Sequence, residues 1–580
     1  MASKLKSELK SRTAIKLSPN AIEVLRCRYL VKNESGRLIE TPAQMFRRVA
    51  HHVAQAEIRF GTPAEADQWE SVFYDIMARL EFLPNSPTLM NAGRPSGQLS
   101  ACFVLPVEDS MESIFDAVKN TALIHQTGGG TGFSFSHLRP ANDVVGSTRG
   151  ISSGPVSFMR VFDAATEAVK QGGARRGANM GILRVDHPDI LEFVQSKRSG
   201  GITNFNLSVA VTEDFMKAVI KNKNYDLVNP RTQKKVKSLS ARKVFGFIAR
   251  CAWENGDPGL IFIDRINEEN PMPEMGKIES TNPCGEMPLF AYESCDLGSI
   301  NLAKLVRGGR FDFDRLGQLV DFGVRFLDDV IEVNRYPIIE IRNITLANRK
   351  IGLGVMGFAD MLIQLEIPYN SERAVVFGES VMKFIQERSK EASRKLAEER
   401  GPFPNFSRSR YAEKGEAPLR NATTTTVAPT GTLSVIAGCS SGIEPLFGIV
   451  FWRNILDGKR LFEVNPYFET AAKKGKFYSK RLIETIAKHG SCQHLKEVPE
   501  YIQKIFLTSF DLTPEDHIHI QAAFQQFTDN AVSKTVNLPE TATEDNVRQI
   551  YLLAYKLGCK GVTIYRNRSR SEQVLNLAKE

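Results

Sequence analysis

Short apolar segments alternate with longer amphipathic ones from about Phe82 onward, and this alternation constrains the fold more than any other feature. The short segments have the length and apolar content of strands; they include 102–106, 204–211, 259–263 and 562–565. A longer segment, 381–400, carries apolar residues at helical spacing and ends at a Gly-Pro pair. Strands that alternate with helices favour an α/β domain with parallel strands. Segment 204–211 alternates apolar and polar residues, which predicts a half-exposed strand.

The first 80 residues have a different pattern and predict a small helical region. Ser18 and Pro19 form a helix start, with an N-cap serine and a proline at the first helical position. A second helical stretch covers about 42–57. A chain of 580 residues is long for one domain, so its length favours several units or one elaborated domain.

Composition excludes some classes of protein. No run approaches the ~18 apolar residues that a membrane-spanning helix needs. The N-terminus lacks the apolar core of a secretory signal, so we expect a cytoplasmic, reducing compartment. Eight cysteines in 580 residues are too few for a disulfide scaffold, so any disulfide is more easily explained by catalysis. The net charge of +9 fits a polyanionic ligand, either nucleic acid or nucleotide phosphate.

Three cysteines are the strongest functional signal. Cys284 lies in Asn-Pro-Cys-Gly-Glu, where the proline and the glycine predict a tight loop. Residues two apart in an extended loop point the same way, so Asn282, Cys284 and Glu286 can face one substrate, with the carboxylate as general base. Taken alone, the motif fits a buried, inert cysteine better. Cys295 and Cys102, a pair suited to reversible oxidation, favour the catalytic interpretation.

Other polar segments are weaker signals. The segment 428–434 combines glycine with small hydroxyl residues before a helix, which suits a phosphate, although an ordinary capped loop explains the segment better when it is taken alone. The Gly-rich segment 127–133 lacks the Gly-Lys-Ser/Thr of a phosphate-binding loop. His517 and His519 lie two apart on a predicted helix and so face different sides, which argues against a metal site. No metal is therefore expected.

The cysteine motifs together resemble the catalytic subunit of ribonucleotide reductases. The spacing of eleven residues between Cys284 and Cys295 is similar to that of the adenosylcobalamin-dependent class II enzymes, and the resemblance covers about 18–575. It implies a ten-stranded α/β barrel made of two five-stranded parallel halves, with the Cys284 loop as a central finger. The implied division is a helical region at 1–80, the barrel at 81–560, and a last strand with a shortened C-terminal segment at 561–580.

The resemblance also implies roles for individual residues. Cys284 would carry a thiyl radical, Glu286 would deprotonate the 3′ hydroxyl, and Asn282 would hold the sugar. Cys102 and Cys295 would supply two electrons and finish as a disulfide. The implied substrate-binding residues are Ser86, Ala101, Thr430, Gly431, Thr432 and Ser434, with Arg175 in a mobile loop that reaches the base. The implied effector-binding residues, expected at a dimer interface, are Asp109, Ser110 and Arg149.

Two departures from relatives refine this expectation. Class I large subunits carry a Tyr-Tyr pair on a late strand, whereas Ile564 stands at one of these positions, so adenosylcobalamin is the more consistent radical source. No C-terminal cysteine pair precedes Glu580, and the helical ATP-cone is also missing at the N-terminus. Either a cysteine tail was removed, or it lies on another chain, or the reductant, a thioredoxin-like protein or a small thiol, reaches the site directly. We also expect control of base choice by dNTP or ATP, without on–off control through a cone.

The sequence thus predicts an adenosylcobalamin-dependent ribonucleotide reductase that acts on ribonucleotides, with diphosphates favoured over triphosphates, and that forms a homodimer. Alternatives are a class I large subunit with a metal-radical partner and a non-catalytic nucleotide-binding regulator. A glycyl-radical enzyme is disfavoured because its C-terminal signature is missing. Nucleic-acid binding would depend on charge alone, since the basic run at 234–237 has no interleaved aromatic residues.

Overall fold

The computed structural model describes residues 15–145, 150–169, 177–198, 200–455, 459–569 and 575–576. Within residues 15–81, three α-helices precede the strand β1 (Phe82–Pro84): α2 (Pro19–Arg28), α3 (Pro42–Ala54) and α4 (Pro63–Ala78). Each begins with a hydroxyl N-cap followed by proline, which satisfies backbone N–H groups and sets the first helical dihedral angle. Both helices expected near the N-terminus are confirmed, although the second ends in a 3₁₀ turn, Gln55–Arg59.

One half of the barrel consists of five parallel strands in the order β2-β3-β4-β5-β8. Their bounds are Cys102–Val104, Gly130–Ser134, Asn179–Arg184, Phe205–Val211 and Gly259–Phe262. The intervening helices include α6 (Met111–Gln126), α7 (Pro155–Ala168), α8 (Ile190–Gln195), α9 (Glu213–Ile220) and α10 (Ala241–Asn255). The strand–helix alternation in the sequence therefore corresponds to a parallel βαβ arrangement.

The second half contains β11 (Ser294–Asn301), β14 (Ile351–Met356), β17 (Thr535–Leu538) and β18 (Gly561–Arg566). β11 pairs in parallel with β14, and β17 pairs in parallel with β18. Between them, parallel bridges join Leu353 to Thr425 and Val427 to Val532, so the extended segment 425–427 occupies the place of a fifth strand.

Antiparallel pairing joins the two halves into a closed ring. β11 pairs with β2 on one side, and β18 pairs with β8 on the other. β1 adds an antiparallel strand along β11. The predicted ten-stranded α/β barrel is therefore confirmed. The prediction of a half-exposed strand at 204–211 is wrong, because every residue of β5 except Asn206 is buried between the outer helices and the barrel interior.

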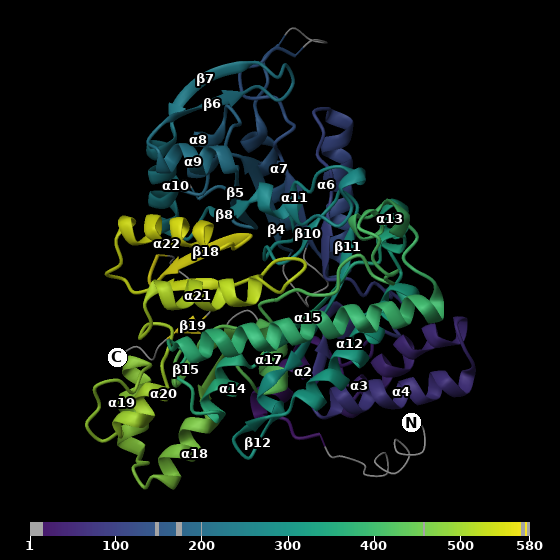
Figure 1. Cartoon of the computed structure of the whole chain (residues 1–580), viewed down its shortest axis with the longest axis vertical. Coiled ribbons are helices and arrows are strands. Elements are labelled where there is room, and N and C mark those ends of the chain that lie inside the picture. Colours follow the sequence, from purple (N-terminus) through teal and green to yellow (C-terminus); the bar gives the residue numbers. More distant parts are fainter. Residues whose placement is uncertain are drawn as a thin grey trace.

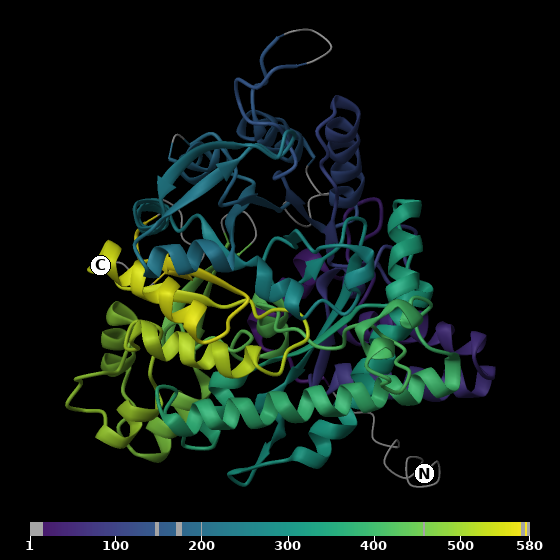
Figure 2. The same cartoon turned by 45° about the horizontal axis from the view of Figure 1, so that its top comes forward.

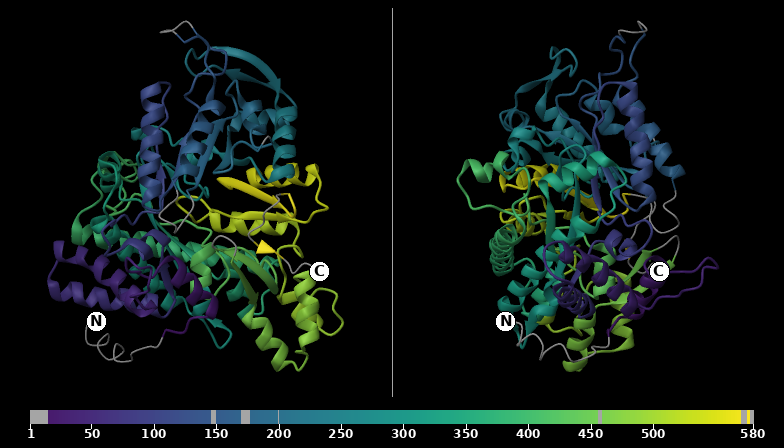
Figure 3. Two further views of the ribbon diagram at one scale, coloured as in Figure 1. Left: turned by 180° about the vertical axis from the view of Figure 1, so that it is seen from behind. Right: turned by 90° about the vertical axis from the view of Figure 1, so that its right-hand side faces the viewer.

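Long helices cover the second half of the barrel (Figure 1). They are α12 (Phe313–Val333), α15 (Glu372–Arg400), α21 (Pro514–Gln525) and α22 (Glu544–Lys556). Figures 2 and 3 show the N-terminal helices on the side of the molecule away from the hairpin of β6 (Asn224–Val228) and β7 (Lys235–Ser240). Among the described helices, none has both the length and the apolarity to cross a bilayer.

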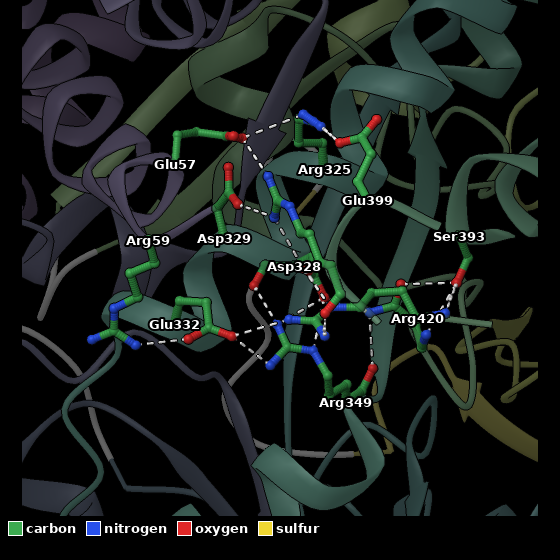
Figure 4. A network of polar contacts seen from close by, with 12 residues as sticks. Glu57, Arg59, Arg325, Asp328, Asp329, Glu332, Arg349, Ser393, Glu399 and Arg420 are labelled. Atoms are coloured by element: carbon green, nitrogen blue, oxygen red, sulfur yellow. Dashed lines mark hydrogen bonds and ion pairs between the residues drawn. The ribbon is translucent and has the colours of Figure 1, made fainter. Parts of the chain in front are cut away.

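A buried network of ion pairs connects the N-terminal helices, α12 and α15 (Figure 4). Arg400, the last residue of α15, places Nη1 2.6 Å from Asp329 Oδ1 and Nη2 2.6 Å from Glu57 Oε1. Asp328 lies 2.8 Å from Arg349 through Oδ1 and Nη2. Burial alone would raise the pKa of Asp328, but the surrounding guanidinium groups lower it to about 2. The surrounding guanidinium groups therefore keep the Asp328 carboxylate charged in the protein interior at neutral pH.

Replacing Arg400 with methionine is expected to lower the free energy of unfolding by roughly 3–5 kcal/mol, because the buried carboxyl groups of Asp329 and Glu57 lose their partner. Urea unfolding at neutral pH measures this loss. Arg388→Met is the matched control on the same helix. Its ion pair with Asp321 is about one-third exposed and is worth roughly 1 kcal/mol or less. Equal losses in the two variants would contradict a stabilising role of the network.

Candidate active site

Cys284 lies at the tip of a hairpin formed by β9 (Ser280–Thr281) and β10 (Pro288–Leu289). The turn is closed by hydrogen bonds from Asn282 N to Met287 O, 3.2 Å, and from Gly285 N to Asn282 O, 3.0 Å. Gly285 has φ of +82°, a conformation that favours glycine. The proline and glycine flanking Cys284 thus produce the predicted tight loop, and the side chain of Cys284 is exposed at its tip.

Glycines of β3 make room for this hairpin. A Cβ atom on Gly132 would lie 1.7 Å from the carbonyl oxygen of Thr281, and one on Gly130 would lie 2.8 Å from Pro283 Cγ. Neither position can carry a side chain unless the hairpin moves. The Gly-rich segment 127–133 is therefore a turn followed by a strand against which the hairpin backbone packs.

Hydrogen bonds from both halves of the barrel hold the hairpin. Asn206 Nδ2 on β5 donates to Pro283 O at 2.8 Å. From the other half, Thr426 Oγ1 and Ala531 N both donate to Glu286 O at 2.9 Å. None of these three residues is predicted from the sequence. They lie 77–245 residues from the motif in the chain, and no local pattern marks them.

Cys102 and Cys295 are register partners across the antiparallel pair of β2 and β11. Opposed residues in such a pair have Cα atoms about 4.5–5.5 Å apart, within the range that a disulfide requires. Both cysteines are buried free thiols in this structure. The predicted dithiol partners are thus adjacent in the fold, although about 190 residues separate them in the chain.

Polar contacts connect the dithiol with the hairpin. Asn282 Nδ2 donates to Cys102 Sγ at 3.1 Å, and Asn282 Oδ1 accepts from Met287 N at 3.0 Å. Burial raises the pKa of the Cys102 thiol, and the Glu286 carboxylate and the other two cysteines raise it further. Glu286 is itself only 3% exposed. The five residues predicted as catalytic therefore form one cluster in the barrel interior.

The predicted phosphate-binding segment begins α17 (Gly431–Ala437). Thr430 has φ of +52°, and its Oγ1 accepts from Gly442 N at 2.8 Å. Ser434 Oγ lies 2.9 Å from Ser441 Oγ. The segment is therefore folded against residues 441–442 and begins a short helix, while Gly431 and Thr432 are more accessible than Ser434.

The other predicted substrate-binding and effector-binding residues lie in different parts of the structure. Ser86 begins α5 (Ser86–Asn91) and lies 2.8 Å from the hydroxyl of Tyr29. Ala101 packs against the cluster that contains Cys102 and Cys295. The predicted base-contacting and effector residues Arg175 and Arg149 lie outside the described residues.

Two other predicted positions have structural partners. Asp109 accepts hydrogen bonds from Arg139 at 2.8–3.1 Å, and Ser110 caps α6 through Ser113 N.

His517 is buried and lies 2.9 Å from Lys534 Nζ. Among the described residues, no group of three or more His, Cys, Asp or Glu side chains has metal-binding geometry.

A closed ten-stranded barrel with a cysteine-bearing hairpin inside it defines a specific class of protein. The family model "Ribonucleotide reductase, barrel domain" matches residues 100–565, and "Ribonucleotide reductase, all-alpha domain" matches residues 15–97. The chain belongs to the ribonucleotide reductase family.

Two relatives and one solved structure are similar to this chain over most of its length. The chain is 49% identical to the vitamin B12-dependent ribonucleoside-diphosphate reductase of Thermoplasma acidophilum, over 97% of this chain and 80% of that protein. It is 50% identical to a Mycobacterium tuberculosis protein of the same name, over 99% of this chain and 82% of that protein. An Actinobacillus ureae class Id ribonucleotide reductase alpha subunit shares the fold, with a TM-score of 0.79 at 24% identity, over 96% and 99% of the two chains.

Proposed function

We propose that this chain reduces ribonucleoside diphosphates to 2′-deoxyribonucleoside diphosphates by a thiyl-radical mechanism, with adenosylcobalamin as the radical source. The observation that carries the proposal is the identity of about one-half, over nearly the whole chain, to enzymes named vitamin B12-dependent ribonucleoside-diphosphate reductase. The grouping of Cys284, Glu286 and Asn282 with a facing dithiol supports the same reaction.

The residues of the barrel fit a cofactor that acts directly on a thiol. When bound, adenosylcobalamin supplies a radical through homolysis of its cobalt–carbon bond. Cys284 is the exposed member of the catalytic cluster and is the residue on which such a radical would act. Ile564 on β18 is aliphatic and only 1% exposed, so it cannot serve as a redox-active tyrosine. The structure thus supports the class II interpretation over a class I large subunit.

The hairpin residues have distinct roles in the first half of the proposed reaction. The Cys284 thiyl radical removes the 3′ hydrogen of the ribose. Glu286 then accepts the proton of the 3′ hydroxyl as a general base and returns it to the 3′ oxygen at the end of the reaction. Asn282 fixes the hairpin through Met287 N and contacts Cys102, so its amide aligns the hairpin with the dithiol.

The dithiol completes the proposed reaction. The 2′ hydroxyl leaves as water, Cys102 and Cys295 provide two electrons and two protons in total, and the two sulfurs join in a disulfide. Their opposition across β2 and β11 supports this role, because a disulfide forms there with little backbone movement. Cys284 finally recovers its radical by returning a hydrogen atom to C3′.

The remaining parts of the proposal concern ligands and partners. We assign the substrate phosphates to Thr430, Gly431, Thr432 and Ser434, the neighbouring substrate contacts to Ser86 and Ala101, and the base contact to Arg175. dNTP or ATP effectors would bind at Asp109, Ser110 and Arg149, at the interface of a homodimer. A thioredoxin-like protein or a small thiol would reduce the disulfide in the cytoplasm. The helical region would end near residue 80 and the barrel near 560.

Anaerobic turnover of CDP and ADP tests the function. Dithiothreitol serves as reductant, adenosylcobalamin is present or absent, and dTTP, dGTP or ATP is supplied as effector. We expect deoxynucleotide only with adenosylcobalamin. Activity that instead requires a metal-radical protein would move the chain to class I. Absence of product with both diphosphates and triphosphates would favour a non-catalytic nucleotide-binding protein.

A further inference from the structure

Lys350 lies beside Cys295, one of the two cysteines of the proposed redox pair. β11 and β14 run parallel with Asp296 opposite Ile351, so the preceding residues, Cys295 and Lys350, lie side by side. Residues in register on neighbouring strands point to the same face of a sheet. Cys102, Cys295 and Lys350 therefore form a row across three adjacent strand positions.

This row faces the interior of the barrel. Two residues further along the same face, Leu297 lies opposite Gly352. A Cβ on Gly352 would be 2.7 Å from Leu297 Cδ2 and 2.6 Å from Thr426 Cγ2. Side chains therefore pack closely against this face of the strands. Ile351 faces the other way, into the core beneath the outer helices.

Lys350 is fixed by a buried ion pair. Its Nζ lies 2.6 Å from Glu293 Oε2, and the two side chains are 2% and 1% exposed. Glu293 also accepts from Phe290 N at 2.8 Å and from Asn348 Nδ2 at 2.5 Å. The ammonium group lies 4.6 Å from the centroid of the Phe290 ring. A cation held in this way has few alternative positions.

The preceding residue anchors the chain on the opposite side of the barrel wall. Arg349 follows α13 (Ile339–Asn348) and has φ of +48°, an uncommon conformation for arginine. Its guanidinium contacts Asp328 at 2.8 Å and Glu332 at 2.7 Å in the network of Figure 4. Arg349 outside and Lys350 inside therefore fix the start of β14 beside Cys295.

The two sulfurs have different electrostatic surroundings. Burial raises the pKa of both thiols. Among the charged groups, the Glu286 carboxylate raises the pKa of Cys102 most. Around Cys295, Asp296, Glu293 and Glu286 raise the pKa, and the Lys350 ammonium lowers it. Asp296 points to the opposite face of β11, and burial raises its own pKa to about 7, so part of its charge is lost near neutrality.

We propose that Lys350 is a positioning residue of the redox pair, whose ammonium group stabilises Cys295 as the thiolate that leaves when the disulfide is reduced. This inference rests on the proposed function, which makes Cys102 and Cys295 the redox pair. It also assigns which sulfur is attacked and which one leaves. The incoming reductant attacks Cys102, which contacts the hairpin through Asn282. The electron pair of the disulfide bond goes to Cys295.

The proposed step uses a dithiol reductant. Its first thiolate attacks Cys102 Sγ, which forms a mixed disulfide and breaks the Cys102–Cys295 bond. The electron pair of that bond remains on Cys295 Sγ, beside Lys350. The second thiol of the reductant, after losing its proton, displaces Cys102 and closes the oxidised reductant. Two electrons pass to the protein, and the two protons lost by the reductant are regained by Cys102 and Cys295.

The test is reduction of the oxidised protein without nucleotide or cobalamin. Diamide oxidises the full chain, and peptide mapping establishes the Cys102–Cys295 linkage. We then expect Lys350→Met, which removes the ammonium group and leaves the Glu293 carboxylate in place, to be reduced by dithiothreitol about three- to tenfold more slowly. Without the ammonium group the Cys295 thiolate is less stabilised and is a poorer leaving group. Lys350→Arg should restore the rate.

A monothiol provides a second readout that a purely structural defect would not produce. With 2-mercaptoethanol, the first mixed disulfide should form on Cys102 in the unaltered chain, and the preference should weaken in Lys350→Met. Lys197→Met is the matched control, because it also removes the lysine of a largely buried lysine–carboxylate pair, in the other half of the barrel.

The outcomes separate the two proposals. An unchanged rate and an unchanged site of attack in Lys350→Met would overturn the role of Lys350 while leaving the redox pair intact. An equal slowing in the control would also overturn it, since the effect would then be general destabilisation. If peptide mapping finds no Cys102–Cys295 disulfide in the unaltered chain, the redox pair itself fails, and this inference with it.

Discussion

Cys284→Ser is expected to lower the rate of deoxynucleotide formation by roughly four orders of magnitude or more, the scale of losing a residue that forms the reactive intermediate. A serine hydroxyl holds its hydrogen far more strongly than a thiol, so it cannot carry the radical in the proposed mechanism. Cys284 is exposed at the hairpin tip, so the substitution creates no core cavity. Turnover of CDP with adenosylcobalamin and dithiothreitol measures the effect.

Cys27→Ser is the matched control for this variant. Cys27 lies on α2, is partly buried, and contacts Glu23 at 3.4 Å, so a serine there keeps a hydrogen-bonding group. We expect the control to retain activity within about twofold and both variants to unfold at similar urea concentrations. Full activity of Cys284→Ser would exclude the thiyl-radical mechanism for this chain.

Gly132→Ala is expected to lower activity by about 100-fold, although the new methyl group touches no substrate. A Cβ at this position would lie 1.7 Å from Thr281 O, so the hairpin must move by more than 1 Å to restore a normal contact. A displacement of about 1 Å at a catalytic group costs on the order of 10²-fold in rate. The rate of CDP reduction measures this loss, and alkylation of Cys284 by iodoacetamide reports the altered hairpin.

Gly201→Ala is the matched control, because no atom lies within 4 Å of its added Cβ and its φ is not positive. We expect its activity and its alkylation rate to match those of the unaltered chain. Wild-type activity of Gly132→Ala would show that the hairpin is not constrained by β3, and the explanation of the Gly-rich segment would then be wrong.

Much of the local structure is predictable from the sequence because it depends on neighbouring residues. The N-cap serine followed by proline predicts the start of α2, and Gly401 after Arg400 marks the end of α15. Strand–helix alternation predicts parallel strands, and the proline and glycine beside Cys284 predict the loop. The misjudged strand, β5, shows the limit of this approach: alternation at 204–211 indicates one polar face, but both faces are covered by other parts of the chain.

The sequence by itself determined the reactive groups of this ribonucleotide reductase: a cysteine between an amide and a carboxylate, two further cysteines, and glycines where a backbone must pass closely. Only the tertiary structure decided which groups meet. Cys102 faces Cys295, Gly132 accommodates Thr281, and Lys350 lies beside Cys295 because strands far apart in the chain pair in one register. Such pairing depends on burial and backbone hydrogen bonding over the whole barrel, and therefore leaves little trace in any local sequence pattern.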